Sequence, residues 1–282
     1  AWAGFVQTRN RRGDGRVRCL HAEQGDDAQA LATELRELAA DAALFIVAED
    51  GGRPLGWIGG EVDATAGRVW LRGPLTVDGP DADTLRRALI DELLRSLPAA
   101  RRFDAFPQSD ETPLVMVYGS TGFNAVAAYH VMRAAQAPEL PAADGIASLQ
   151  PGAAVMPQLL ALHEQLFPNT YLRGDALPAS LDANHLLFAA VQGDQLLGYV
   201  YVQHKHAEPE GYVDYLGVAE AARGRGLGRA LLATALRWAL RERGLPCVHL
   251  TVRQQNAEAL GLYRSVGFVE VAAGLQLSWQ RP

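Results

Sequence analysis

An internal repeat is the feature that most constrains the fold of this chain. Residues 44–57 align without gaps on residues 186–199, and residues 85–90 align on residues 227–232. Both alignments have the same offset of 142 residues. Because self-similarity at one period indicates that a structural unit has been duplicated, the 282 residues are predicted to form two copies of one domain.

A later motif supports the duplication and helps to place its boundary. The pattern Tyr-x-x-x-Gly-Phe begins at Tyr118 and again at Tyr263, an offset of 145 residues. A stretch rich in proline and alanine, at residues 137–143, separates the two copies. Since domain boundaries fall in such segments, the first domain is predicted at residues 1–138 and the second at residues 139–282.

Hydrophobic periodicity predicts a mixed order of strands and helices. In the second copy a strand at residues 212–218 precedes a helix at residues 227–243. Strands that cluster with helices between them are typical of α/β or α+β folds, so each copy is predicted to be a twisted mixed β-sheet flanked by α-helices. In the first copy, strands are expected at residues 16–21, 44–48, 55–62, 68–77, 102–106 and 124–133, and helices at 29–40, 84–97 and 114–118.

The composition is that of a folded, mildly acidic chain. Its hydrophobic share of 49% and charged share of 21% exclude a disordered protein, and its net charge of −6 gives no reason to expect a nucleic-acid partner. No apolar run approaches the ~20 residues of a membrane span. The apolar start of the chain is followed by arginines, the reverse of a signal peptide. A cytoplasmic protein without a membrane partner is expected, as a monomer or homodimer.

The sequence gives no reason to expect a metal site. Cys19 and Cys247 lie far apart and match no metal-ligand spacing, which is typical of reduced thiols. His249 falls in an alternating strand pattern and is interpreted as a strand residue whose neighbours satisfy it. His204 and His206 are two residues apart but lack a third ligand nearby.

A glycine-rich stretch lies where the strand at 212–218 gives way to the helix. The first N–H groups of a helix have no partner within it, and they carry the positive end of the helix dipole. Glycines let the backbone close on a phosphate, and arginines add positive charge. The stretch is therefore predicted to bind a pyrophosphate, through Arg223, Gly224, Arg225, Gly226, Leu227, Gly228 and Arg229.

Two common phosphate-binding motifs do not fit this stretch. A P-loop needs Gly-Lys-Ser/Thr at the helix start, but Gly228 is followed by Arg229 and Ala230. A dinucleotide fingerprint needs Gly or Ala at position 229 or 231, where Arg229 and Leu231 stand. A purely structural glycine turn before a core helix remains the alternative.

The stretch does match the pattern Arg/Gln-x-x-Gly-x-Gly/Ala, and a second pattern, Asn-x-x-Ala-x-x-Leu-Tyr-x-x-x-Gly-Phe, runs from Asn256 to Phe268. In these two motifs the sequence resembles the GNAT superfamily of N-acetyltransferases, in a tandem arrangement similar to that of two-domain mycothiol synthases. The resemblance implies that acetyl-CoA is the cofactor, with its pyrophosphate on the glycine-rich stretch and its pantetheine arm beside the strand. The cofactor-binding residues that it adds are Leu216, Gly217, Val218 and Asn256.

The first copy departs from this pattern where the cofactor would bind. The positions that correspond to Arg223 and the two motif glycines hold Asp81, Thr84 and Arg86, with Asp78 and Asp83 nearby. Carboxylates there can cap the free N–H groups of the helix, and they would repel a pyrophosphate. We therefore expect a single active site in the second copy, and a structural or substrate-shaping role for a degenerate first copy.

Two residues of the second copy are candidate catalysts. The resemblance implies that Tyr263 places its phenol near the CoA sulfur as a general acid; the alternative is an aromatic that supports Phe268, which the retention of Tyr118 favours. Asp214 lies in mid-strand, where a carboxylate is costly unless it is paired or used, and it is the candidate base, directly or through water. The alternative is a carboxylate paired with a neighbouring donor.

The period of two in a strand predicts that Tyr212, Asp214, Leu216 and Val218 share one face. Tyr212 is the second choice as base, and it is also a candidate for contact with the substrate. Tyr171 and Asp175 lie before the hairpin of the second copy, where the resembled family lines its acceptor pocket, and they could hold a cationic amine.

These inferences converge on one predicted function. The chain is expected to be an acetyl-CoA-dependent N-acetyltransferase that acylates a primary amine of a small molecule or peptide. A non-catalytic acyl-CoA-binding or regulatory protein is the alternative, and a dinucleotide-dependent enzyme is a more distant one.

Overall fold

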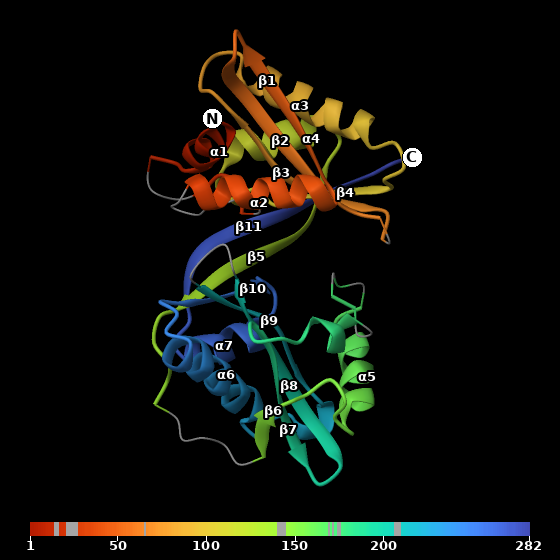
Figure 1. The fold of residues 1–282 in the computed structure, drawn as a ribbon, viewed down its shortest axis with the longest axis vertical. Coiled ribbons are helices and arrows are strands. Elements are labelled where there is room, and N and C mark those ends of the chain that lie inside the picture. The colour runs from red at the N-terminus through yellow and green to blue at the C-terminus, as the bar shows by residue number, and fades with distance from the viewer. Residues whose placement is uncertain are drawn as a thin grey trace. The chain divides into compact units, whose positions relative to one another are not determined.

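In the computed structural model of the protein, the described residues are 1–13, 17–20, 28–64, 66–139, 145–168, 170, 172–173, 176–205 and 210–282. The chain packs into two compact units (Figure 1). The first unit comprises Ala1–His130 and Ala272–Pro282, and the second comprises Val131–Val271. Each unit combines a mixed sheet with helices, as predicted. The ranges 1–138 and 139–282 remain a prediction about the duplication, whereas the compact units describe packing.

The first unit is built on strands in the order β1-β2-β3-β4-β11. The pairs β1–β2, β2–β3 and β4–β11 are antiparallel, and β3–β4 is parallel. Helix α3 buries Leu89, Ile90 and Leu93 in a core that also contains Tyr118 and Leu277. The elements are α1 (Trp2–Asn10), α2 (Ala28–Asp41), β1 (Ala43–Asp50), β2 (Arg53–Asp63), β3 (Arg68–Thr76), α3 (Ala82–Ser96), β4 (Arg102–Ala105), α4 (Thr112–Ser120), β5 (Asn124–Ala134) and β11 (Val269–Gln280).

Most of the elements predicted for the first copy are confirmed, with two differences. The strand predicted at residues 16–21 is wrong for the described residues there, because Val17 and Cys19 form only isolated bridges, to Arg11 and Pro107. Helix α1 was not predicted. Its polar and apolar residues are not sorted onto opposite faces, so it lacks the periodic signal that identifies a helix.

The second unit has strands in the order β5-β10-β9-β8-β7-β6, of which β5 contributes its end. The pairs β6–β7, β7–β8 and β8–β9 are antiparallel, and β9–β10 is parallel. The predicted helix at 227–243 is an α-helix followed by a π-helical turn. The elements are β6 (Ile146–Ser148), α5 (Met156–Leu166), β7 (His185–Gln192), β8 (Gln195–Lys205), β9 (Glu210–Val218), α6 (Leu227–Arg237), the π turn (Trp238–Glu242), β10 (Val248–Arg253) and α7 (Ala257–Ser265), with 3₁₀ turns at Pro178–Ser180 and Glu220–Ala222.

Helices cover both faces of this second sheet. On one face α6 buries Leu231 and Leu232 in a core that includes Val200 and Val202 of β8. On the other face α5 buries Leu159 against Tyr199 and Tyr201 of the same strand. Because successive strand residues point to opposite faces, β8 contributes side chains to both cores.

One observation bears on association with membranes. Among the residues that the structure describes, no helix is both long enough and apolar enough to cross a lipid bilayer.

The close approach of β8 and β9 at Gly198 gives a test of the packing. A Cβ at Gly198 would lie 2.7 Å from the Gly217 carbonyl oxygen and 3.2 Å from the Val218 Cα. Both are backbone atoms and cannot rotate away, so Gly198→Ala is expected to lower the free energy of unfolding by about 1–3 kcal/mol, the usual penalty of overpacking. Urea denaturation followed by circular dichroism measures the change.

A matched control lies in α7. A Cβ at Gly261 would meet nothing within 4 Å, and alanine is favoured over glycine inside a helix by about 0.5–1 kcal/mol. Gly261→Ala should therefore leave stability unchanged or raise it. A Gly198→Ala protein as stable as the parent would contradict the close approach of the two strands.

Candidate active site

A β-bulge in β9 determines where the candidate catalytic residues point. Tyr201 pairs with Tyr215 and Val202 with Val213, so Asp214 is the extra residue of the bulge. Val213 and Leu216 consequently pack in the core under α6, whereas Tyr215 packs in the core under α5. The prediction that Tyr212, Asp214, Leu216 and Val218 share one face is wrong, because a bulge shifts the alternation by one residue.

The two central strands of the unit separate just beyond this point. β9 and β10 pair in parallel only at Gly211–Val248 and Tyr212–His249. After Tyr212, β9 is paired on one side with β8 through Val218, and the described part of β10 forms no further ladder with it. Because buried backbone groups need hydrogen-bond partners, the open side of β9 between 213 and 218 is suited to an extended ligand with amide groups.

The glycine-rich stretch follows β9 directly and leads into α6. Gly224 and Gly226 have φ angles of 73° and 77°, a conformation that glycine adopts without strain. Gly226 is the N-cap of α6, and no side chain caps that end of the helix. The first N–H groups of α6 are thus left for a ligand, and the dipole favours an anion.

Side chains around the stretch keep it open and positively charged. Arg225 is exposed. Arg223 donates a 3.3 Å hydrogen bond from Nε to the Val218 carbonyl, and Arg229 donates one of 3.4 Å to the Ser265 carbonyl. A Cβ at Gly228 would lie 3.1 Å from Leu262 Cδ2 of α7, and one at Gly217 would lie 2.7 Å from Tyr199 Cε1. These two glycines are therefore also required for packing.

Tyr263 differs from its counterpart Tyr118 in the state of its hydroxyl. Tyr118 is fully buried and donates a hydrogen bond of 2.5 Å to the Gly73 carbonyl, and burial raises its pKa well above the usual value. Tyr263 also packs edge-on against a phenylalanine, Phe268, but its hydroxyl has no hydrogen-bond partner among the described residues. Burial raises the pKa of Tyr263 to about 12. Tyr118 is thus a satisfied core residue, whereas Tyr263 retains a proton to donate.

Asp214 is held in place by a neutral partner. Gln203 of β8 donates a 2.7 Å hydrogen bond from Nε2 to Asp214 Oδ2. An amide donor orients a carboxylate without neutralising it, and a carboxylate has about four acceptor positions. The expected donor is therefore present, and it is an uncharged group. The bulge is what could not be foreseen from the alternation of the strand.

Tyr212 is poorly suited to act as a base. Its hydroxyl lies 2.5 Å from Thr251 Oγ1 of β10. Burial, followed by the negative charge of Asp214, raises the pKa of Tyr212. A phenol with a raised pKa stays protonated at neutral pH, so Tyr212 is a hydrogen-bond donor rather than an acceptor of an amine proton.

Of the remaining candidates, Asn256 has a structural partner, and Tyr171 and Asp175 are not among the described residues. Asn256 is the N-cap of α7, and its Oδ1 accepts a 3.1 Å hydrogen bond from the Ala259 N–H. Tyr171 and Asp175 lie outside the described residues. Near them, Thr170 hydrogen-bonds to the Tyr215 hydroxyl at 2.5 Å, so this segment reaches the α5 face of the sheet close to the bulge.

The carboxylates near the start of α3 have partners other than those predicted. Asp81 is the N-cap of α3, but no side chain caps that helix, so the expectation of carboxylate capping is wrong. Asp83 pairs with Arg86 at 2.7 Å, and Asp78 pairs with Arg9 at 3.0 Å. These carboxylates are therefore engaged by arginine side chains instead of the backbone N–H groups of the helix.

Sequence reasoning missed three residues that the fold brings to the site. Gln203 and Thr251 lie on β8 and β10 and hydrogen-bond to Asp214 and Tyr212. His163 of α5 is fully buried, with Nδ1 2.7 Å from the Tyr199 hydroxyl and Nε2 2.9 Å from the Leu172 carbonyl; burial lowers its pKa. A buried polar residue within an apolar helix was the available signal for His163, whereas Gln203 and Thr251 sit in ordinary strand patterns.

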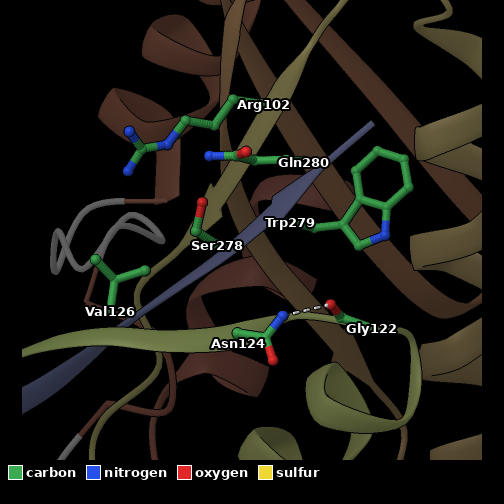
Figure 2. Close-up of a pocket in the computed structure, with 7 residues that line it drawn as sticks. All are labelled: Arg102, Gly122, Asn124, Val126, Ser278, Trp279 and Gln280. Atoms are coloured by element: carbon green, nitrogen blue, oxygen red, sulfur yellow. Dashed lines mark hydrogen bonds between the residues drawn. The ribbon is translucent and has the colours of Figure 1, made fainter. Parts of the chain in front are cut away.

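A separate pocket lies wholly within the first unit. Figure 2 shows its lining, and its volume is about 410 Å³. Arg102 is the one titratable residue that lines it, and none of the predicted site residues takes part. The lining could hold a small polar molecule, but it offers neither a glycine-rich helix start nor a group that donates a proton near neutral pH. Its residues are Arg102, Gly122, Asn124, Val126, Ser278, Trp279 and Gln280.

Comparison with known sequences identifies relatives of parts of the chain. Residues 156–268 match the acetyltransferase (GNAT) family. A mycothiol acetyltransferase of Renibacterium salmoninarum is 30% identical over an alignment of 210 residues that covers 66% of this chain and 62% of that protein. One of Thermomonospora curvata is 41% identical over 96 residues, 34% of this chain and 31% of that protein. The alignments thus span less than two thirds of each of these relatives.

Comparison with solved structures extends over the whole chain. A GCN5-related N-acetyltransferase from Sphaerobacter thermophilus superimposes with a TM-score of 0.72 at 20% identity, covering 99% of this chain and 92% of the other. A tandem GNAT protein from the clavulanic acid biosynthesis pathway gives a TM-score of 0.68 at 16% identity, covering 100% and 94%. These likenesses concern the fold. Residues 156–268 thus match the acetyltransferase (GNAT) family, within a chain that has the tandem GNAT fold.

Proposed function

We propose that the protein is an acetyl-CoA-dependent N-acetyltransferase with a single active site in its second unit, acting on a primary amine. The observation that carries the proposal is the continuity of the open backbone of β9 with the uncapped N-terminus of α6. An extended amide-bearing arm that ends in a pyrophosphate fits both features at once. The family match over residues 156–268 supports the same cofactor.

The residues present fit acetyl-CoA on chemical grounds. The N–H groups at the start of α6, with Arg223, Arg225 and Arg229, would hold the pyrophosphate, because they offer donors and positive charge without a competing carboxylate cap. The backbone of Leu216, Gly217 and Val218 would pair with the pantetheine amides. Asn256 would act through the start of α7, which it caps. Acetyl-CoA supplies the activated acetyl group as a thioester.

The proposed catalytic roles divide between two side chains. A free alkylamine is mostly protonated at neutral pH, since its reference pKa is about 10.4, so a base must take a proton before the nitrogen can attack. Asp214, oriented by Gln203, is proposed to take that proton directly or through water. Tyr263 is proposed to donate its proton to the departing sulfur. A pKa of about 12 keeps its phenol protonated at working pH, so the proton is present to be donated as the bond to sulfur breaks.

The acceptor is proposed to be the amine of a small molecule. The relatives from Renibacterium and Thermomonospora are named mycothiol acetyltransferases, so a mycothiol-type amine is the first acceptor to assay. Tyr171, Asp175 and Tyr212 remain proposed contacts for it. A screen of amines that measures CoA release tests this choice.

The first prediction concerns stoichiometry. Isothermal titration with acetyl-CoA should give one site per chain, because only α6 follows a glycine-rich turn, whereas α3 follows a turn crowded by Asp78, Asp81 and Asp83. Gly228→Asp should abolish binding, since its carboxylate would occupy the anion site at the helix start. Thr84→Asp, which adds the same charge to the exposed first turn of α3, is the control and should bind normally. Two sites per chain would contradict the single-site proposal.

The second prediction concerns Tyr263. Tyr263→Phe removes only the hydroxyl, so affinity for acetyl-CoA should hold while kcat falls by roughly 10²–10⁴-fold, as for the loss of a general acid. The control is Tyr118→Phe, which removes the hydrogen-bond donor of the buried Gly73 carbonyl. This control should lose about 1–3 kcal/mol of stability but keep its kcat. Equal kcat values for Tyr263→Phe and the parent would remove Tyr263 from the mechanism.

The third prediction concerns the pH dependence of turnover. Asp214→Asn should lower kcat most near neutral pH and progressively less at alkaline pH, where the acceptor amine loses its proton unaided. Tyr212→Phe serves as the comparison, and the shape of its pH profile should match that of the parent because Tyr212 stays protonated throughout. A pH-independent loss in Asp214→Asn would indicate damaged packing, and an unchanged profile would move the base elsewhere.

A further inference from the structure

Three potential metal ligands converge at the paired end of β9 and β10. Glu210 begins β9, Cys247 precedes β10, and His249 lies two residues further along. The parallel register of Gly211 with Val248 puts Glu210 beside Cys247, and the alternation of the strand puts Cys247 and His249 on one face. Their ligand atoms all lie within 4.8 Å of one another. Neither the family match nor the proposed acetyl transfer involves these three side chains.

The geometry of His249 indicates that it is not simply paired with the carboxylate. Its Nδ1 lies 2.9 Å from Glu210 Oε2. Yet this buried nitrogen makes no hydrogen bond of acceptable geometry with any described residue. The ring nitrogen therefore approaches the carboxylate without directing its lone pair or proton at it. Such an arrangement is expected of two ligands that face a common centre.

The two separations from Glu210 approach those of a tetrahedral zinc site, and the third pair of ligand atoms lies within 4.8 Å. Bonds of about 2.3 Å to sulfur and 2.0–2.1 Å to nitrogen and oxygen place tetrahedral ligands about 3.3–3.6 Å apart. Cys247 Sγ lies 3.7 Å from Glu210 Oε2, and His249 Nδ1 lies 2.9 Å from it. Side-chain movements of a few tenths of an ångström in Glu210 would bring both separations into the tetrahedral range.

We propose that Glu210, Cys247 and His249 form a binding site for a zinc-like divalent cation, with solvent at the fourth position. Sulfur, imidazole and carboxylate together select zinc or a similar transition metal over magnesium and calcium, which prefer oxygen ligands. Cys247 is 4% exposed, while the side chains of His249 and Glu210 are 18% and 21% exposed. The site is sheltered but retains a route for the ion.

The position of this site suggests what the cation does. The ligands lie at the end where β9 and β10 are still paired, and the strands separate directly after the Tyr212–His249 pair. A cation bound there would link β9 to β10 next to the point where they separate, at the unpaired part of β9 that we propose for acetyl-CoA. The metal proposal itself stands on the three ligands and not on that function, so either can fail alone.

Another charge affects the site. The Arg133 guanidinium lies beside the Cys247 thiol, where its positive charge repels a cation. A metal binds cysteine as the thiolate, so binding must release the proton of the thiol.

Cobalt(II) is the probe for this site, because its absorption spectrum reports whether sulfur is a ligand. The full chain, stripped with a chelator and kept reduced, is titrated with CoCl₂. A sulfur-to-cobalt charge-transfer band in the near ultraviolet should saturate at one ion per chain and disappear when ZnCl₂ is added. Cys247→Ser should lose the band, and His249→Gln should bind cobalt at least about 100-fold more weakly, since even outer-shell changes cost 10–100-fold.

The chain supplies its own control in its other cysteine. Cys19 is also buried, with its thiol 3.7 Å from the Phe106 carbonyl, so Cys19→Ser should keep the charge-transfer band unchanged. The same Cys19→Ser chain covers the case in which Cys247→Ser fails to fold, because Cys247 is then its one cysteine and a charge-transfer band must come from it. No charge-transfer band in the parent, or a band that survives in Cys247→Ser, would overturn the proposal.

Discussion

The open backbone of β9 is the constraint on which the candidate site depends. A strand inside a sheet normally pairs on both sides, and an unpaired buried peptide group is costly. β9 pairs with β8 from Glu210 to Val218 but with β10 at only two positions. The backbone between 213 and 218 must therefore pair with water or with a ligand. An amide-bearing arm replaces water there without loss, and the direction of β9 leads it to the start of α6.

The sequence predicted the scaffold of this site better than its side chains. The strand, the glycine-rich turn and the helix were all read correctly because hydrophobic period and glycine placement are local signals. The assignment of β9 residues to the two faces of the sheet was wrong. A bulge depends on how two strands pair and cannot be recognised from the sequence of one strand alone. Val213 and Leu216 share a core although they are three positions apart in the sequence. For the same reason Gln203, which orients Asp214, could not be recognised before the strands were paired.

The first unit shows what the same fold looks like without an open site. α3 begins among carboxylates, yet these are engaged by Arg9 and Arg86 rather than by the helix backbone. Tyr118 packs against a phenylalanine as Tyr263 does, but its hydroxyl donates a hydrogen bond to the Gly73 carbonyl. Retention of the tyrosine in both copies therefore indicates a shared packing role. The two tyrosines differ in whether the hydroxyl is engaged, which is a property of the surroundings and not of the motif.

Proton transfer in the second unit follows from how burial acts on each kind of acid. Burial raises the pKa of Tyr212 and of Tyr263 because it disfavours the phenolate. Neither phenol can then accept a proton at neutral pH, although both can donate one. Asp214 sits at a bulge and accepts a hydrogen bond from the Gln203 amide. In the proposed acetyl transfer a phenol can therefore serve only as a proton donor, and the carboxylate is the proposed acceptor of the amine proton. Of the two phenols, only Tyr263 lacks a hydrogen-bond partner among the described residues, since Tyr212 is engaged by Thr251.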